Sequence, residues 1–321
     1  MDRRLKVLVT GSGGFLGYHL SRRLCQLNDF SVFGIDNFSR YPMDGMYEEL
    51  LSSSNFTHFE IDMSNAGSLT GLPYFDYVFH FAALNGTNNF YSQPFSVIKA
   101  GVLPTINLLE HLTLSKPKKL IYAGTSESYA GAVEIFNYPV PTSEEVPLVI
   151  PDVRNSRWSY AASKTLGEVA VASVAQSEKF DFNIVRFHNV YGPRMGTSHV
   201  IPELIKRFRE GDFTIFGGAN SRSFIYIDDA VDSLLLLLED TSLSNEIVNI
   251  GNEDLIPISR LALRVQQAIG KTGEITDQGA PLGSPMMRCP DITKIRSIGY
   301  ESKVSLEQGI QETLKYYSAT L

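Results

Sequence analysis

Short apolar segments recur along the first 190 residues, and helical periodicity fills the stretches between them. Several of these segments are apolar at consecutive positions, which is typical of parallel strands covered by helices on both faces. The predicted strands are 6–10, 31–36, 57–62, 77–82, 119–125 and 182–187. The predicted helices are 14–27, 94–115 and 158–178. This regular alternation predicts an α/β fold with a doubly wound parallel sheet.

The pattern changes after residue 190, where strands and helices no longer alternate regularly. The elements predicted there are helix 200–210, strand 246–251, helix 258–269 and a final helix near 305–317, with a polar segment containing Gly and Pro at 270–290. This pattern predicts a smaller C-terminal α+β domain. The expected domains are 1–187 and 188–321, with part of 220–253 returning to the first.

The composition is that of an acidic globular protein. Hydrophobic residues make up 43% and charged residues 20% of the 321 positions, which is sufficient for a sizeable core. The net charge of −7 argues against general binding to nucleic acid or to anionic membranes. Cys25 and Cys289 are the two cysteines, so neither a disulfide framework nor a metal site is predicted. A cytoplasmic protein is expected, because no signal-peptide pattern opens the chain and the aliphatic run 234–238 is too short to span a bilayer.

Three glycines and one acidic residue form a dinucleotide-binding pattern. The first predicted strand runs into GSGGFLG, a helical pattern follows, and Asp36 ends the second strand. Gly11 permits a tight turn, Gly14 lets the backbone approach a pyrophosphate, and Gly17 lets the helix pack close to the sheet. Asp36 can accept hydrogen bonds from the adenosine ribose, and its charge would repel a 2′-phosphate. The sequence therefore predicts a Rossmann-type domain that binds NAD.

A second pattern carries acid–base chemistry. Tyr160 and Lys164 are four residues apart in a helical region, so their side chains are expected on one face. A nearby ammonium stabilises a phenolate and is expected to lower the pKa of the tyrosine. Thr125 ends a predicted strand and would hydrogen-bond the reacting oxygen beside Tyr160. His80 and His188 are interpreted as packed structural residues.

Further motifs accompany these two patterns along nearly the whole chain. They are Asp62 after the third strand, HFAA at 80–83, RFHNVYGPR at 186–194, RSFIYIDDAV at 222–231 and RCPDITK at 288–294. With them the sequence resembles extended short-chain dehydrogenase/reductases of the nucleotide-sugar epimerase/dehydratase type. The resemblance implies that bound NAD oxidises a sugar hydroxyl, usually at C4, to a 4-keto intermediate. Tyr160 would take the hydroxyl proton, and Lys164 would hold the nicotinamide ribose.

The resemblance also assigns the remaining site residues, and it makes the C-terminal domain mainly a substrate-binding domain. The cofactor-binding residues it implies are Gly11, Gly14, Phe15, Leu16, Gly17, Asp36, Asn37, Asp62, Met63, Phe81, Ala82, Ala83, Tyr160 and Lys164. The substrate-binding residues it implies are Asn85, Thr87, Ser126, Asn189, His199, Val200, Phe216, Arg222, Arg288 and Asp291. Within that set, the two arginines would clamp the nucleotide portion, because guanidinium groups bind phosphates bidentately.

Glu127 decides between reactions that share the C4 oxidation. A 4-epimerase needs only the return of hydride to the other face of the 4-keto sugar. A dehydratase needs a base for the proton at C5, which Glu127 could provide, together with help for departure of the C6 hydroxyl. The run Thr-Ser-Glu at 125–127 is similar to that of GDP-mannose-type dehydratases and of UDP-glucuronate decarboxylases.

Several functions therefore stay open at this level. Epimerase and Glu127-assisted dehydratase are weighted about equally, and a nucleotide-uronate decarboxylase and a nucleotide-sugar 4-dehydrogenase are the alternatives. A non-catalytic NAD(H)-binding regulator represents a different class, but it would not need Thr125, Tyr160 and Lys164. The apolar helices 94–115 and 158–178 are expected to pair across a two-fold axis, as the resemblance implies, which predicts a homodimer.

Overall fold

The computed structural model describes residues 4–40, 42–280 and 285–320. Its main feature is a seven-stranded sheet with the strand order β11-β6-β5-β4-β1-β2-β3. The strands are β1 Leu5–Thr10, β2 Phe30–Asp36, β3 Phe56–Glu60, β4 Tyr77–His80, β5 Lys119–Thr125, β6 Asp181–Phe187 and β11 Glu246–Ile250. β1 pairs in parallel with both β2 and β4, so the chain starts in the middle of the sheet and winds outward in two directions. The predicted doubly wound fold is confirmed.

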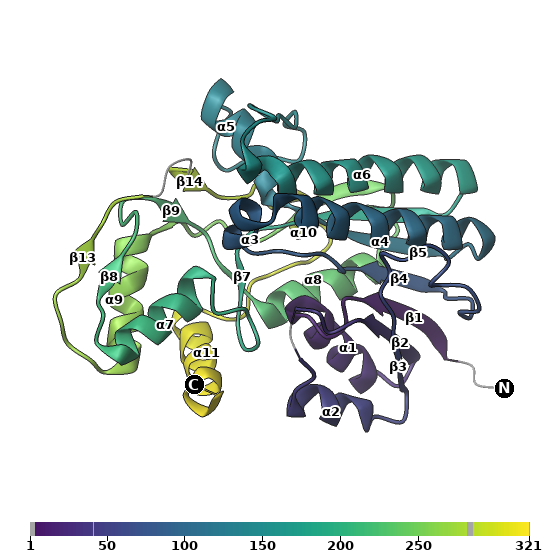
Figure 1. The fold of residues 1–321 in the computed structure, drawn as a ribbon, viewed down its shortest axis with the longest axis horizontal. Coiled ribbons are helices and arrows are strands. Elements are labelled where there is room, and N and C mark those ends of the chain that lie inside the picture. Colours follow the sequence, from purple (N-terminus) through teal and green to yellow (C-terminus); the bar gives the residue numbers. More distant parts are fainter. Residues whose placement is uncertain (1–3, 41, 281–284, 321) are drawn as a thin grey trace. The chain divides into compact units, whose positions relative to one another are not determined.

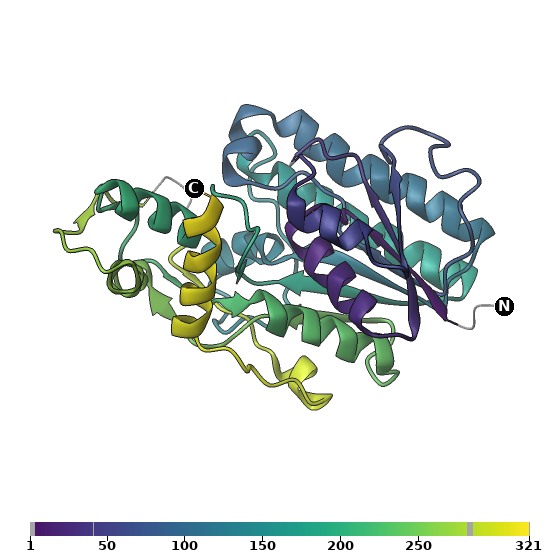
Figure 2. The ribbon, with the colours of Figure 1, turned by 90° about the horizontal axis from the view of Figure 1, so that it is seen from below.

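Helices cover both faces of this sheet (Figure 1). α4 Pro94–Leu114 and α6 Ser159–Glu178 lie side by side over β4 and β5, and α1 Phe15–Gln26 lies on the opposite face. Figure 2 views the strands from the side on which α1 lies. Coverage on both faces explains why the strands are apolar at consecutive positions: every residue of β5 is buried.

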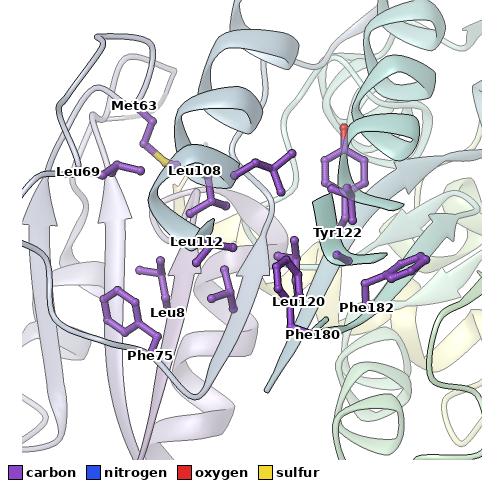
Figure 3. Packing of buried hydrophobic residues seen from close by; sticks show 14 of the residues in the cluster. Leu8, Met63, Leu69, Phe75, Leu108, Leu112, Leu120, Tyr122, Phe180 and Phe182 are labelled. Atoms are coloured by element: carbon purple, nitrogen blue, oxygen red, sulfur yellow. The ribbon is translucent and has the colours of Figure 1, made fainter. Parts of the chain in front are cut away.

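The core of the sheet lies under α4 and α6. Leu108 and Leu112 of α4 meet Leu8 and Leu120 of the strands in one buried cluster (Figure 3). The same cluster includes Val171 of α6 and aromatic side chains from neighbouring segments. Complete burial of one leucine side chain stabilises the folded state by about 1.5–3 kcal/mol. This packing holds the start of α6, with its Tyr160, against the sheet.

Short helices escape the sequence pattern because too few residues show the helical period. They are α2 Gly45–Leu51, α3 Thr87–Ser92, α5 Ala130–Phe136 and the 3-10 helices η1 Ser126–Tyr129 and η2 Ser156–Trp158. The long predicted helices agree with the structure to within a residue or two at most ends. α4 continues through Pro104, which its neighbours bury.

The chain divides into two compact units. The first unit contains residues 4–128, 150–186 and 234–248, and the second contains 129–149, 187–233 and 249–320. The helices beyond α6 are α7 Val200–Glu210, α8 Ile227–Glu239, α9 Ile258–Ile269, α10 Thr293–Ser297 and α11 Leu306–Thr320. The short strands are β7 Val190–Tyr191, β8 Thr214–Ile215, β9 Ser221–Arg222, β10 Ile225–Tyr226, β12 Ile256–Pro257, β13 Thr276–Asp277 and β14 Met287–Arg288. They form small sheets with the orders β12-β9-β14, β10-β7 and β13-β8.

Residues 129–149 differ from the domain division expected from the sequence, because they cluster with the second unit. Long-range hydrogen bonds to Asn249 explain this. The Tyr129 hydroxyl donates to the Asn249 Oδ1 atom at 2.9 Å. The amide nitrogen of Asn249 donates to a Glu144 carboxylate oxygen at 2.8 Å, and its side-chain nitrogen donates to the Thr142 carbonyl at 3.0 Å. Such contacts cannot be read from local periodicity.

Candidate active site

The glycine loop between β1 and α1 has the geometry of a pyrophosphate cradle. Gly11 has a φ of +72°, and a Cβ atom there would lie 2.8 Å from the Ala82 amide nitrogen. A Cβ atom on Gly17 would lie 2.1 Å from the Gly11 carbonyl oxygen, so α1 packs directly onto the loop. Gly14 caps α1 without a side-chain hydrogen bond, and Phe15 begins the helix. The loop therefore fits a dinucleotide whose pyrophosphate takes hydrogen bonds from the helix N-terminus.

Asp36 stands at the end of β2 beside this loop. Its carboxylate accepts hydrogen bonds from the amides of Gly13 at 2.9 Å and Phe38 at 2.8 Å. These bonds fix the carboxylate next to the glycine loop and leave lone pairs for ribose hydroxyls. The neighbouring Asn37 is exposed and accepts a hydrogen bond from the Ser39 amide.

The remaining predicted cofactor residues follow β3 and β4 or lie on the first turn of α1. Met63 is buried in the sheet core, and the exposed Asp62 accepts a bond from the Ser64 amide at 2.9 Å. The Thr10 hydroxyl accepts bonds from the amides of Phe81 and Ala82, which holds the segment after β4 beside the glycine loop. Leu16 and Ala83 are partly buried.

His80 is a structural residue, as expected from the sequence. Its Nδ1 atom lies 2.7 Å from the Thr10 hydroxyl and its Nε2 atom lies 3.0 Å from the Thr105 hydroxyl. Burial, with a smaller contribution from the charge of Lys164, lowers the pKa of His80 to about 3. The imidazole is therefore neutral and ties β1, β4 and α4 together.

Tyr160, Lys164 and Thr125 meet where β5 ends and α6 begins. The Thr125 side chain is near enough to the Tyr160 phenol to favour its ionised form and so to act against the effect of burial on the phenol's pKa. The Lys164 ammonium lies 4.8 Å from the centre of the Tyr122 ring, with the residue only 1% exposed. Burial lowers the pKa of Lys164 to about 8, and the charge of Glu168 opposes this shift. A buried phenol with a hydroxyl beside it, and a buried amine one turn further along the same helix, are the groups that proton transfer requires.

The expected lowering of the Tyr160 pKa is not what the structure gives. Burial raises the pKa of Tyr160 above its ordinary value, and the charge of Glu127 adds to the increase. The charge of Arg40 and the Thr125 side chain act in the opposite direction without overcoming burial. The free-energy cost of removing the phenolate from water is larger here than its stabilisation by nearby positive charge.

Helix α3 supplies an aromatic side chain that the sequence analysis missed. The ring of Phe90 stacks on the ring of Tyr160, with the centroids 5.0 Å apart and the planes 11° from parallel. Val97 of α4 and Leu84 complete this small apolar cluster. The signal available in the sequence was an aromatic pair in the polar run TNNFYS, which does not reveal its distant partner.

Glu127 lies in η1 and forms an ion pair with Arg157 of η2, with 3.5 Å between the carboxylate oxygen and the guanidinium nitrogen. The Glu127 amide donates to the Thr125 hydroxyl at 3.2 Å, so the carboxylate and the hydroxyl belong to one turn. Ser126 between them is buried. Arg157 was not predicted, although it precedes Tyr160 by only three positions.

The segment before α3 is held by local hydrogen bonds. The Asn85 side-chain oxygen accepts from the Gly86 amide at 2.6 Å, and the Asn89 side chain donates to the Asn85 carbonyl at 2.9 Å. Thr87 begins α3, and its side chain lies outside the described residues.

The second unit places two of its predicted arginines together. β14 pairs in parallel with β9, and Arg288 is the register partner of Arg222. The Arg222 guanidinium donates to the carbonyls of Ser221 at 2.8 Å and Pro285 at 2.7 Å. Two adjacent guanidinium side chains on neighbouring strands are suited to a diphosphate. Asp291 accepts a hydrogen bond from the Thr293 hydroxyl and amide, which lowers its pKa.

The other predicted residues of this unit have defined surroundings. Asn189 has a φ of +39° and donates from its side chain to the Ser223 carbonyl at 2.8 Å. Phe216 is 45% exposed, and the Arg207 guanidinium lies 4.9 Å from the centre of its ring. His199 caps α7 without a side-chain hydrogen bond to the helix, and Val200 is the first residue of that helix. His188 is buried, as expected, with its ring 5.9 Å from that of Tyr129.

Among the residues that the structure describes, no three or more His, Cys, Asp or Glu side chains gather as metal ligands would. No helix in the described ranges has the length and apolar character needed to cross a membrane.

Comparison with known proteins assigns the family. The model of the NAD dependent epimerase/dehydratase family matches residues 7–251, which is most of the chain. This match and the Rossmann-type sheet define the class, an NAD-dependent enzyme. The chain belongs to the NAD-dependent epimerase/dehydratase family.

Individual relatives cover the chain almost completely. The chain is 31% identical to a UDP-N-acetyl-alpha-D-glucosaminuronate decarboxylase of Bacillus cytotoxicus, over 97% of each chain. It is 28% identical to UDP-glucuronic acid decarboxylase 1 of Xenopus tropicalis, over 99% of this chain and 73% of that one. Among solved structures, the UDP-glucuronic acid 4-epimerase of Bacillus cereus in complex with UDP-glucuronic acid and NAD is similar, with a TM-score of 0.87 and 27% identity over 99% of this chain and all of that one.

Proposed function

We propose that this chain is an NAD-dependent decarboxylase of a UDP-uronate, a UDP-sugar that carries a carboxylate at C6. The observation that carries the proposal is the position of Glu127, in one turn with Thr125 and close enough to Tyr160 for its charge to act on the phenol. The decarboxylase names of the relatives from Bacillus cytotoxicus and Xenopus tropicalis support it. Each of the three relatives described above is named for a UDP-uronate.

The first step is the oxidation of C4. NAD, when bound, accepts a hydride from C4, returns it at the end of the cycle, and brings a positive charge that favours the phenolate. Tyr160 accepts the proton of the C4 hydroxyl as general base. Thr125 stands beside the phenol and orients it. Lys164 adds a positive charge on the same helix face, and because the residue is buried, water screens that charge only weakly.

The second step is loss of carbon dioxide. The C4 ketone makes the substrate a β-keto acid, so the C5–C6 bond can break and its electron pair can move to the C4 oxygen as an enolate. Carbon dioxide leaves, and C5 takes a proton from the Glu127 carboxyl group acting as general acid. Return of hydride to C4 and of the proton from Tyr160 to the oxygen gives a UDP-pentose. One proton is consumed for each carbon dioxide released.

A 4-epimerase is the second candidate. The likeness to the Bacillus cereus 4-epimerase favours it, as does the sufficiency of Tyr160, Lys164 and Thr125 for hydride removal and return. Glu127 has no task in that reaction because C5 keeps its proton. Dehydration by Glu127 and simple dehydrogenation stay predictions that the same measurement separates.

We propose binding roles for the remaining predicted residues on the same basis. NAD binding is assigned to the glycine loop, Asp36 and the segment 81–83. The backbone of the loop lies too close to the 81–82 backbone for a side chain to fit between them, and polar groups lie at the ends of the strands. The adjacent Arg222 and Arg288 bind the substrate diphosphate.

One experiment decides among these functions. The enzyme is incubated with UDP-glucuronate, with UDP-N-acetylglucosaminuronate and with UDP-glucose, which keeps the C6 hydroxyl that dehydration removes, and products are analysed by mass spectrometry and chromatography. Loss of carbon dioxide from a uronate is expected. An unchanged mass with altered retention would replace the proposal by epimerisation, loss of water by dehydration, and loss of two hydrogens by dehydrogenation. Tyr160→Phe should stop every one of these conversions, whereas Tyr91→Phe, on the half-exposed neighbour of Phe90, should not.

We also propose that the chain forms a homodimer through α4 and α6. Apolar side chains stand exposed along both helices, led by Leu114 at 88% and Phe95 at 72%. The others are Ile98, Leu103, Ile106, Leu166 and Val169. Two adjacent helices with such a surface can bury it against a second copy.

A further inference from the structure

The ion pair between Glu127 and Arg157 joins two segments of the first unit that are thirty positions apart in sequence. Glu127 lies in η1, which follows β5, and Arg157 lies in η2, which directly precedes the helix that carries Tyr160. The two side chains are 24% and 9% exposed, so the pair is shielded from water on most sides. An ion pair in such a place is stronger than one on the surface, because less water screens its charges.

Arg157 itself is held in position from two directions. The Asn155 side-chain oxygen accepts a hydrogen bond from the Arg157 amide at 3.1 Å, which caps η2. The guanidinium carbon of Arg157 lies 4.9 Å from the centre of the Trp158 ring, and Trp158 is buried. A planar guanidinium packed on an indole loses little freedom when it contacts a carboxylate. The geometry is that of a fixed cation presented to Glu127.

We propose that Arg157 is a positioning residue for Glu127, which orients its carboxyl group and sets its acidity for the C5 step. Arg157 has no part in the oxidation of C4, which depends on Tyr160, Lys164 and Thr125. The inference rests on the proposed function, since Glu127 has a task only where chemistry takes place at C5. It extends that function by giving the Glu127 acid a dedicated partner.

The alternative is a purely structural role, in which the pair ties together the chain on either side of the 129–149 excursion. The two roles predict different kinetics. A structural tie would affect both chemical steps equally, because Thr125 and Tyr160 stand beside the same two turns. A positioning residue affects only the step that uses Glu127.

The test compares Arg157→Gln, Arg157→Lys, Glu127→Gln and the double variant Arg157→Gln with Glu127→Gln. C4 oxidation is followed as reduced nicotinamide in a single turnover, and the C5 step as carbon dioxide released from UDP-glucuronate. Arg154→Gln is the matched control, because Arg154 is 88% exposed and pairs with Asp152 of its own segment. Thermal unfolding of each variant shows whether it is folded.

We expect Arg157→Gln to leave C4 oxidation nearly unchanged and to slow carbon dioxide release about 10- to 100-fold, the range typical of a misplaced reacting group. Reduced nicotinamide should therefore accumulate. Arg157→Lys should recover part of the rate, because it keeps the charge and loses the planar contact. The double variant should be no slower than Glu127→Gln alone, since Arg157 acts through Glu127.

The pH profile gives a readout that a structural role would not move. In the pH profile of the rate of carbon dioxide release, the limb that disappears in Glu127→Gln reports the ionisation of Glu127. Removing a neighbouring cation raises the pKa of a carboxyl group, so this limb should move to higher pH in Arg157→Gln.

Three results would overturn the inference: equal loss of both steps in the folded Arg157→Gln protein, additive losses in the double variant, or an unmoved limb. If Arg157→Gln does not fold, the same comparisons are made on Arg157→Lys. Failure of the proposed function is distinguishable, because the unaltered enzyme would then release no carbon dioxide from either uronate.

Discussion

Gly17 is the residue at which the backbone leaves least room for change. A Cβ atom would meet the carbonyl oxygen of Gly11 at 2.1 Å, far inside van der Waals contact. The neighbour is backbone, which cannot rotate away, so the loop or α1 must shift. The cost falls on the pyrophosphate cradle as well as on folding.

Gly17→Ala should therefore lower the free energy of unfolding by about 1–3 kcal/mol, the usual effect of overpacking. Denaturant unfolding measures it, and NAD binding by calorimetry should weaken in parallel. Gly45→Ala is the control, because a Cβ atom there would have no heavy atom within 4 Å outside its chain neighbours and its own helix. Equal stability of the Gly17→Ala protein and the control would show that the loop absorbs the extra carbon without strain.

Residues that follow a fixed spacing can be proposed for this site from the sequence alone. The glycines, Asp36 and the Tyr160–Lys164 pair each lie within one local element, so a short pattern contains all the information. Phe90 and Arg157 contact side chains from other elements, and no spacing rule links position 90 to position 160. The direction of the Tyr160 pKa was also wrong, because its burial depends on packing that the sequence pattern does not express.

At the scale of elements, α3 and α6 together set the environment of the phenol. The stacked Phe90 ring covers one face of Tyr160 and contributes to the burial that raises its pKa. The short α3 thus has a chemical consequence although it is only six residues long.

Phe90→Ala should expose Tyr160 to water and lower its pKa toward the ordinary value. The limb of kcat/KM that rises with pH as Tyr160 ionises should then move to lower pH. Phe95→Ala, which removes an exposed ring from the adjoining helix, should leave the limb in place. A limb that does not respond to Phe90→Ala would mean that α3 does not control the hydration of Tyr160.

α6 is also attached to β6 by a buried ion pair. The Arg186 guanidinium donates to both carboxylate oxygens of Glu168, at 3.1 and 2.6 Å, with both side chains almost completely buried. Two hydrogen bonds between two charges offset much of the cost of removing them from water.

Arg186→Met should destabilise the protein by about 3–5 kcal/mol, because it leaves the Glu168 charge buried without its partner. Combining it with Glu168→Leu should restore much of this loss, since no buried charge remains. Chemical denaturation of the two variants and the unaltered protein provides the comparison. A single variant as stable as the double variant would contradict the buried-charge explanation.

The elements themselves were predicted better than their connections. β5 spans the predicted residues, and α7 and α9 begin and end where the periodicity indicates. The sequence placed 129–149 differently, because the hydrogen bonds of Asn249 that hold this segment connect positions more than a hundred residues apart.

At the scale of the whole molecule, the exposed apolar surface of α4 and α6 predicts self-association. Light scattering should give twice the mass of one chain. Leu166→Glu with Val169→Glu should shift the protein to the monomer, because charges placed in an apolar contact lose their hydration. Val153→Glu, at an exposed apolar position outside these helices, is the control. A monomeric mass for the unaltered protein would exclude the dimer.

The positions of Glu127 and Arg157 in the sequence also have a consequence for how this type of reaction can be exchanged between related genes. Apart from Lys164, the four residues proposed to direct the reaction lie between positions 125 and 160, on either side of the 129–149 excursion. Recombination between two related genes could therefore exchange acid, partner cation, phenol and hydroxyl in one continuous stretch of DNA. New reaction outcomes could spread through such a family by exchange of this stretch, with the glycine loop and the paired Arg222 and Arg288 left unaltered.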